Sequence, residues 1–405
     1  MKTAAIIAEY NPFHNGHKYQ IDKLREQLGA DTAVIAIMSG NFTQRGELAI
    51  ADKTVRARAA IDSGVNLVLE LPFPYSMSSA EFFAAAGVHI ANSIGVVDFL
   101  VFGSENGDIG TLSEIAENML SEKFLAALCE REASPENAAV GYPQLCESTY
   151  NVTFEKKAPS SLFSPNNILA LEYIKALLRI GSLITPITIK RSGAGYNDPL
   201  IHKTELQSAN SLRKLINGRD NSAFNYIPNT AARAFFDAQK DGKMPSDESR
   251  LDNAVISHFR LNSPTESVNI HDAAGGLYNR LCRISAQATS ISSLTSMTET
   301  KKYTSARIRR AVWNSFFGVT SSDVRRTPAY TQVLGLDSIG RLLLKRIKKM
   351  SDFPVITKPS SYNELSDDVI LQKELSNKAD SVYGLSLDAP NSGTFALSFT
   401  PYVKK

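Results

Sequence analysis

Five short apolar segments alternate with helical segments along the first half of the chain. They occupy residues 4–8, 32–38, 65–71, 96–102 and 183–189. Apolar runs of roughly four to eight residues between turn residues are typical of buried strands. Helical periodicity fills intervals between them, for example at about 14–28, 52–63 and 79–93. Strands that alternate with helices form parallel sheets covered on both faces, so the sequence predicts an α/β fold with a doubly wound, Rossmann-like parallel sheet.

Polar or glycine-containing loops follow four of these strands directly. They span residues 9–17, 39–47, 71–75 and 103–106. In parallel sheets of this kind, ligands bind beyond the carboxyl ends of the strands. We therefore expect these loops to build one ligand site at a single edge of the sheet.

The first of these loops contains His14 and His17 around Gly16. Asn11-Pro12 ends the strand, because proline disfavours regular structure in the residue before it. The two histidines are three positions apart near a helix start, so they share one side of that helix. Gly16 allows close approach to the backbone, and the free N–H groups of a helix start favour phosphate. Paired histidines could also bind zinc or be an accidental polar helix start, and the motif alone does not distinguish these two possibilities from a phosphate site.

A second helix start lies at Ser208, a plausible N-cap followed by Arg213 and Lys214. The two helix starts together resemble the two signatures of the nucleotidyltransferase superfamily that includes class I aminoacyl-tRNA synthetases. The resemblance implies that His14 and His17 contact the phosphates of ATP, with Arg213 and Lys214 on the opposite rim. Asn210 stands where many relatives have threonine.

Other nucleotide-binding motifs fit less well. The chain has no Gly-x-x-x-x-Gly-Lys-Ser/Thr sequence, which excludes a P-loop, and Gly193-Ala194-Gly195 is too short for a dinucleotide fingerprint.

Five sequence blocks in order resemble the bacterial tRNA(Met) cytidine acetate ligase family. They are residues 9–17, 38–47, 102–108, 165–169 and 302–307, and the resemblance extends from residue 1 to about 350. Leu48 departs from the pattern, because relatives usually have proline there.

The resemblance implies an enzyme that activates acetate with ATP, giving acetyl-adenylate and pyrophosphate. It would then acetylate N4 of the wobble cytidine of elongator tRNA(Met), forming N4-acetylcytidine. Magnesium would accompany the ATP, although no residues form a committed metal site.

The catalytic residues carried over are His14, His17, Arg213 and Lys214. The ATP-binding residues carried over are Ile7, Ala8, Glu9, Tyr10, Asn11, Pro12, Phe13, His14, Asn15, Gly16, His17, Lys18, Tyr19, Gln20, Gly103, Asn166, Arg191, Ser192 and Ser208. The loop at 39–47 is expected to form a wall of the acetate pocket.

Positive charge is concentrated between residues 301 and 350. This stretch has twelve Lys/Arg and two acids, a net charge of +10, whereas the whole chain carries only +3. Such asymmetry favours a polyanionic partner, although a solvated basic helix surface is the alternative. The predicted tRNA contacts are Lys301, Lys302, Arg307, Arg309 and Arg310. Aromatic residues nearby, including Tyr303 and Trp313, could stack on bases but at helical spacing are more often core.

The strand–helix alternation stops near residue 225. We expect a catalytic ATP-binding domain at 1–225 and a mainly α-helical, basic tRNA-binding region at 226–405. Three widely spaced cysteines argue against a disulfide framework and fit a reducing cytoplasm. Apolar stretches end before the roughly 18 residues that a membrane span needs. The oligomeric state is open.

Two other functions compete with the ligase. One is a nucleotidyltransferase that adenylylates a small phosphorylated metabolite, and the other is a noncatalytic RNA-binding protein with a relic nucleotide fold. A +10 block on about 180 additional residues disfavours the first. Both histidines, Gly16 and Arg213 disfavour the second.

Overall fold

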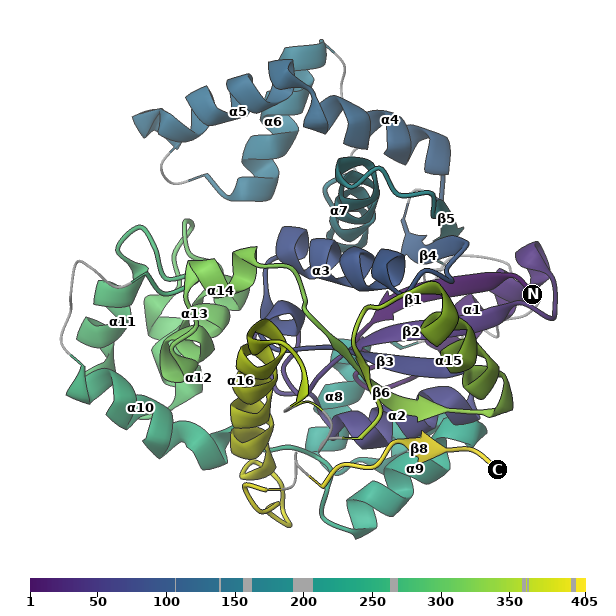
Figure 1. Cartoon of the computed structure of the whole chain (residues 1–405). Coiled ribbons are helices and arrows are strands. Elements are labelled where there is room, and N and C mark those ends of the chain that lie inside the picture. Colours follow the sequence, from purple (N-terminus) through teal and green to yellow (C-terminus); the bar gives the residue numbers. More distant parts are fainter. Residues whose placement is uncertain are drawn as a thin grey trace.

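A mostly parallel sheet forms the centre of the molecule (Figure 1). The computed structural model describes the whole chain except residues 106, 138–139, 156–161, 192–206, 263–268, 359–361, 363 and 395–397. Within the described residues the sheet has eight strands in the order β5-β4-β1-β2-β3-β6-β7, with β8 also paired to β6. The strands are β1 (Thr3–Ala8), β2 (Ala33–Ser39), β3 (Leu67–Leu71), β4 (Phe99–Ser104), β5 (Thr185–Lys190), β6 (Thr331–Leu336), β7 (Val355–Ile356) and β8 (Tyr402–Val403).

The five predicted strands are adjacent and parallel, which confirms the expected fold class. β1 pairs with β2 from Thr3 opposite Ala33 to Ala8 opposite Met38. β4 and β5 continue the sheet on the other side of β1. The carboxyl ends of these strands therefore meet at one edge, as parallel pairing requires.

The sheet also contains a strand from beyond residue 225. β6 pairs antiparallel with β3 and carries β7 and β8. Its sequence includes Gln332 and Gly335, which interrupt the apolar run that would predict a buried strand. Gln332 is buried nonetheless, because its side-chain oxygen accepts a 2.6 Å hydrogen bond from Lys373 Nζ. The division at residue 225 stays a prediction, and β6 shows that the sheet draws residues from both sides of it.

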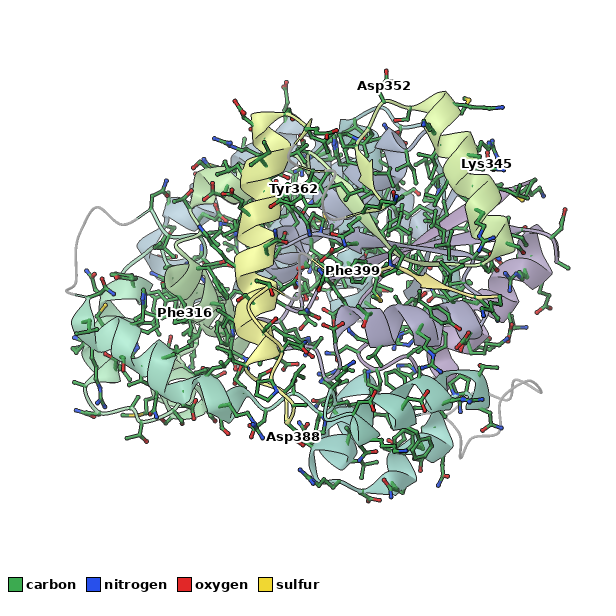
Figure 2. The ribbon with its side chains drawn as sticks, turned by 60° about the horizontal axis from the view of Figure 1, so that its bottom comes forward. Phe316, Lys345, Asp352, Tyr362, Asp388 and Phe399 are labelled. Carbon is green, nitrogen blue, oxygen red and sulfur yellow. The ribbon has the colours of Figure 1, made fainter. Side chains whose placement is uncertain are left out.

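Helices cover both faces of the sheet (Figures 1 and 2). One face packs against α3 (Ala80–Ser93), α7 (Pro165–Arg179) and α15 (Ser338–Met350) in an apolar core. The other face packs against α1 (Asn15–Leu28), α2 (Lys53–Asp62), α8 (Ala209–Asn217) and α9 (Asn229–Lys240). Three further helices, α4 (Ile109–Leu120), α5 (Glu122–Ala133) and α6 (Tyr142–Phe154), extend from α7 at the top of Figure 1. None of the helices in the described parts of the chain is long and apolar enough to cross a membrane.

A separate helical part lies beside the sheet, at the left of Figure 1. Short 3-10 helices occur at η1 (Tyr75–Met77), η2 (Pro135–Asn137), η3 (Asn221–Tyr226) and η4 (Glu248–Leu251). The helical part comprises α10 (Asp252–Leu261), α11 (Leu277–Ser285), α12 (Ile291–Thr298), α13 (Ser305–Phe317) and α14 (Ser321–Arg325), and α16 (Asp367–Gly384) completes it on the side of the sheet. Its core surrounds Trp313, which is fully buried. Phe42, from the loop after β2, packs edge-on against Trp313 with ring centroids 5.2 Å apart. The loops that follow the strands therefore also belong to the core of the helical part.

A buried group of charges ties α16 to the sheet. Lys53 Nζ lies 2.6 Å from Glu70 on β3 and 2.5 Å from Asp380 on α16. Asn41 donates a 2.9 Å hydrogen bond to the same Asp380 carboxylate. Burial penalises isolated charges strongly, so these groups stabilise the fold only as a set.

Candidate active site at the ends of the parallel strands

Two histidines form a capping box at the start of α1. His14 is the N-cap residue, and its Nδ1 accepts a 3.0 Å hydrogen bond from the Gly16 N–H. The Nδ1 of His17 accepts a 3.2 Å hydrogen bond from the His14 N–H. This reciprocal pattern usually involves Ser or Thr with Glu or Gln. Here imidazoles satisfy the backbone donors, and the two rings stack with centroids 3.8 Å apart.

This arrangement fixes the tautomer of both rings. A nitrogen that accepts a hydrogen bond must carry its lone pair, so in a neutral imidazole the hydrogen resides on the other nitrogen. Both His14 and His17 therefore hold their proton on Nε2. The pair presents Nε2–H donors from the helix start, where the positive end of the helix dipole also favours an anion.

Both rings are held neutral. Burial lowers the pKa of His14 to about 3, and the positive charges of Arg191 and Arg213 act in the same direction. Burial also lowers the pKa of His17, and its stacked neighbour His14 and Arg191 add to the effect. The histidines therefore act as hydrogen-bond donors rather than as charges, while the charge of the site comes from the arginines.

A buried arginine holds the strand ends together. Arg56 on α2 has no exposed surface, and its guanidinium donates to the carbonyls of Glu9 (2.6 Å), Ser39 (3.1 Å) and Ala51 (2.9 Å). The first two of these carbonyls lie at the ends of β1 and β2, so one side chain fixes both loops. Arg56 is not among the site residues predicted from the sequence. A signal for its burial existed, because Val55, Ala57 and the following residues make the helix apolar around most of its circumference.

Arg213 reaches the loop that carries the histidines. Its guanidinium donates to the Asn11 carbonyl at 3.0 Å and pairs with Glu47 at 3.0 Å. Ser208 caps α8 by accepting a 3.1 Å bond from the Ser211 N–H. The structure thus brings the two predicted helix starts together at the strand ends. Glu47, from the loop at 39–47, is a partner that the sequence analysis did not assign.

A second cluster forms where β4 and β5 end. Arg191 donates to the Asn166 side chain at 3.2 Å, and Asn166 donates to the Glu105 carboxylate at 2.5 Å. A Cβ at Gly103 would lie 3.2 Å from Arg191 Cγ, so glycine leaves room for this arginine. Glu105 lies in the sequence block at 102–108, but it was not predicted as a site residue.

The other predicted ATP-binding residues differ in whether a ligand could reach their side chains. The side chains of Ile7, Tyr10 and Phe13 are buried in the two cores beside the sheet, so a ligand could reach only their backbone. Glu9 is bonded to the Gln44 N–H at 2.9 Å, and burial raises the pKa of its carboxyl. Ser192 lies outside the described residues.

The predicted tRNA contacts occupy two different environments. Lys301 and Lys302 are exposed just before α13. Arg310 differs from the expected surface contact, since it is only 8% exposed and pairs with Asp272 at 2.7 Å. Arg309 is also engaged, because it pairs with Glu248 and donates to the Gly46 carbonyl at 3.3 Å. Arg310 also donates to the Gln44 carbonyl at 3.4 Å, so both arginines attach α13 to the loop after β2. Their charges are already balanced by the two carboxylates.

The basic stretch does not form one surface. α13 belongs to the helical part, at the left of Figure 1, whereas α15, with its exposed Arg341, Lys345, Lys348 and Lys349, packs against the sheet at the right of Figure 1. The aromatic residues around Trp313 form core, as their helical spacing favoured.

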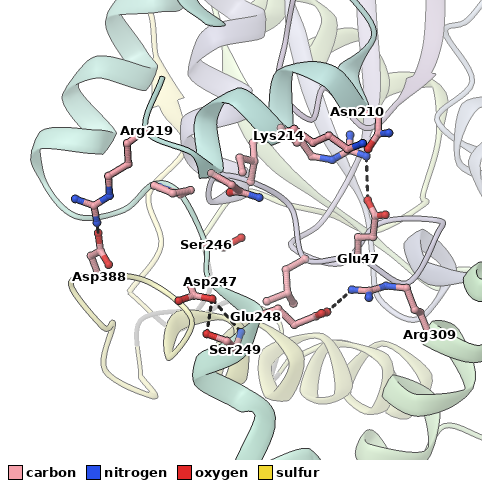
Figure 3. Close-up of a pocket in the computed structure, with 15 residues that line it drawn as sticks. Glu47, Asn210, Lys214, Arg219, Ser246, Asp247, Glu248, Ser249, Arg309 and Asp388 are labelled. Atoms are coloured by element: carbon pink, nitrogen blue, oxygen red, sulfur yellow. Dashed lines mark hydrogen bonds and ion pairs between the residues drawn. The ribbon is translucent and has the colours of Figure 1, made fainter. Parts of the chain in front are cut away.

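A polar cavity of about 560 Å³ lies beyond Arg213 (Figure 3). Its walls include Glu47, Arg213, Lys214 and Arg309, so it borders both the strand-end loops and α13. Within the described residues, no group of three or more His, Cys, Asp or Glu side chains could hold a metal ion.

The sequence and the fold are both similar to known proteins. The family described as HIGH nucleotidyl transferase matches residues 1–394. The tRNA(Met) cytidine acetate ligases of Acetivibrio thermocellus and of Caldanaerobacter subterraneus subsp. tengcongensis are each 36% identical to this chain, over 96% and 100% of both sequences, respectively. The crystal structure of Thermotoga maritima TmcAL bound with alpha-thio ATP superposes with a TM-score of 0.91 at 30% identity, covering 100% of this chain and 99% of that one.

Proposed function

Because this chain belongs to the HIGH nucleotidyltransferase family and, within it, to the tRNA(Met) cytidine acetate ligases, we propose that it is an ATP-dependent ligase of that type. It activates acetate as acetyl-adenylate and transfers the acetyl group to N4 of the wobble cytidine of elongator tRNA(Met). ATP is its co-substrate, and Mg²⁺ would accompany it. Its place of action is the cytoplasm, where its tRNA substrate resides.

The observation that carries this proposal is the pair of Nε2–H donors at the start of α1. A triphosphate placed there meets two neutral imidazoles, the positive end of the α1 dipole and the cations Arg191 and Arg213. The residues present therefore fit a polyanion. Neutral donors and fixed cations stabilise charge that develops during reaction without first reorganising.

The chemistry needs positioning rather than a protein nucleophile. One oxygen of acetate attacks the α-phosphorus of ATP, an O–P bond forms, and the bond to the bridging oxygen breaks as pyrophosphate leaves. N4 of cytidine then attacks the acetyl carbonyl, AMP leaves with the electrons of the C–O bond, and N4 loses one proton. His14, His17 and Arg213 would stabilise the phosphate oxygens during the first step.

The rest of the nucleotide would lie along the strand ends. We assign the backbone of the segment from Ile7 to Gln20, together with Gly103, Asn166 and Arg191, to ATP binding. The amide of Asn166 offers both a donor and an acceptor, and Arg191 can pair with phosphate. The tRNA would approach from the helical part, where Lys301 and Lys302 are exposed and Arg307 bonds to the Asp272 carbonyl at 3.1 Å.

Acetate-dependent ATP–pyrophosphate exchange tests this function. The unaltered protein should catalyse exchange with acetate, and His14→Asn should lower the rate by about 10²–10³, the usual effect of losing one donor to developing charge. His89→Asn is the matched control, because His89 lies on α3 away from the site. Absence of exchange with or without tRNA would contradict the ligase. Exchange that depends on a phosphorylated metabolite instead of acetate would favour a small-molecule nucleotidyltransferase.

A further inference from the structure

The cavity beyond Arg213 adjoins the predicted ATP site and shares Arg213 and Lys214 with it. His14, His17, Gly103, Asn166 and Arg191 do not line it. Its volume of about 560 Å³ lies in the range of small-molecule sites. Lys214 and Asn217 on its wall are not buried, so the cavity opens to solvent. It therefore offers space for a second ligand.

One face of α8 supplies a continuous polar wall to this cavity. Asn210, Arg213, Lys214 and Asn217 are spaced i, i+3, i+4 and i+7, which places them on one side of the helix. Leu212 and Ile216, by contrast, are buried in the core beside the sheet. The sequence of α8 thus places two amides and two cations on the cavity lining, and Figure 3 shows Asn210 and Lys214 among them.

The charges of the cavity wall are nearly balanced. Arg213 pairs with Glu47, Arg309 with Glu248, and Arg219 with Asp388 at 3.3 Å. Among the described lining residues, Lys214 is the cation without an assigned ion pair. Asp247 also lines the cavity, so four cations face four acids and the wall carries no net charge. Lys214 offers a place for a single anionic group of a ligand whose other groups are neutral and form hydrogen bonds.

Arg213 links this cavity to the site of adenylate formation. One of its nitrogens bonds to the Asn11 carbonyl in the histidine loop, and another bonds to Glu47 in the cavity wall. Leu48, Ile50 and Pro245 supply apolar groups to the lining, beside the polar residues Ser246, Asp247 and Ser249. A flat ring could pack on these groups while its edge faces the amides of α8.

We propose that this cavity receives the target pyrimidine nucleotide after it is turned out of the anticodon loop. The inference rests on the proposed function and extends it by locating the second substrate. One nucleotide has one phosphate charge for Lys214 and a base edge with donors and acceptors for Asn210 and Asn217. Single-stranded bases can be splayed out and read in this way. Arg213 would then lie between the site where acetate is activated and the site where the acetyl group is transferred.

Asn217 provides the test, because it lies at the end of α8 and is separate from the histidines. Asn217→Phe should fill the cavity, and Asn217→Ala should remove one hydrogen-bonding group. We expect at least a tenfold loss of acetylation of a tRNA(Met) transcript for the first variant and about tenfold for the second. Acetate-dependent ATP–pyrophosphate exchange should stay within about twofold, which also shows that the variants fold. Asn229→Phe, at an exposed asparagine on α9, is the matched control.

A binding measurement makes the test independent of the first step. A tRNA(Met) transcript with fluorescent pyrrolocytidine at the wobble position should brighten on binding to the unaltered protein and to Asn229→Phe, but not to Asn217→Phe. Normal acetylation and normal brightening by Asn217→Phe would overturn the inference, as would equal loss of acetylation and exchange. Absence of exchange in the unaltered protein would contradict the proposed function, while the fluorescence result would still decide whether the cavity takes the nucleotide.

Discussion

Replacing His14 by asparagine separates its role as a helix cap from its role as a donor. Asparagine is among the best N-cap residues, so α1 should lose only a few tenths of a kcal/mol at neutral pH, whereas His14→Ala should cost about 1 kcal/mol. Both variants lack the Nε2–H and should lose adenylate formation to a similar degree. Activity that follows helix stability instead would refute the assignment of His14 as a phosphate donor.

The pH dependence of the free energy of unfolding tests whether His14 is held neutral, and the size of the effect follows from its pKa. Folding lowers the pKa of His14 from 6.5 to about 3, so the unfolded chain binds the proton more readily. The contribution to stability is therefore complete above about pH 7.5 and is lost as the pH falls through 6.5 toward 3. At pH 5 the loss amounts to about 2 kcal/mol. His14→Asn removes this effect, so its stability should fall less than that of the unaltered protein between pH 7.5 and pH 5.

Histidine-selective NMR measures the protonation state directly. The chain has six histidines, and the signal that disappears in His14→Asn identifies residue 14. Its ¹³Cε1 shift should stay flat from pH 8 to pH 5, and its ¹⁵N shifts should show the proton on Nε2. Urea denaturation at the two pH values gives the stability difference. A titration midpoint between pH 6 and 7, or a proton on Nδ1, would refute the reasoning from the capping box.

Three further predictions concern the packing around the site and the exposed lysines. Asp380→Asn should destabilise the fold by about 3–5 kcal/mol, because Lys53 would lose a buried partner; urea denaturation checks this, and a change below about 1 kcal/mol would contradict it. Gly46→Ala should lower the thermal midpoint more than Gly181→Ala. Both glycines have positive φ, but only at Gly46 would a Cβ meet backbone, 2.6 Å from the Arg310 nitrogen. Replacing Lys301 and Lys302 by alanine should weaken tRNA binding and reduce the salt dependence of log K by about 0.7–0.9 for each phosphate that is no longer neutralised; an unchanged slope in filter binding would remove these lysines from the interface.

The parallel strands and the histidine loop were predictable because their signals are local. An apolar run between turn residues specifies a buried strand wherever it occurs, and His14 and His17 are three residues apart on one helix. The tautomer was not predictable, because it depends on which backbone N–H each ring accepts.

Long-range pairing explains what the sequence did not reveal. Lys53 looks like a surface charge in isolation, but it is buried, and its partner on α16 follows much later in the chain. Arg310 looked like a phosphate contact, yet it pairs with Asp272. The count of basic residues between 301 and 350 says nothing about which of them share a surface. Charge is a property of sequence, whereas balance of charge is a property of contacts.

The bond between Asn41 and Asp380 has a consequence for synthesis of the protein. The two residues are 339 positions apart, an interval that a ribosome covers in about 17–70 s at roughly 5–20 residues/s. α16 also donates to the Phe73 carbonyl from Ser376 and to the Ala49 carbonyl from Tyr383. During that interval a nascent chain has its parallel strands but lacks the hydrogen bonds from α16 that hold the loops after β2 and β3 in place. Competence to bind nucleotide should therefore arise late in translation, after most of the sheet has formed.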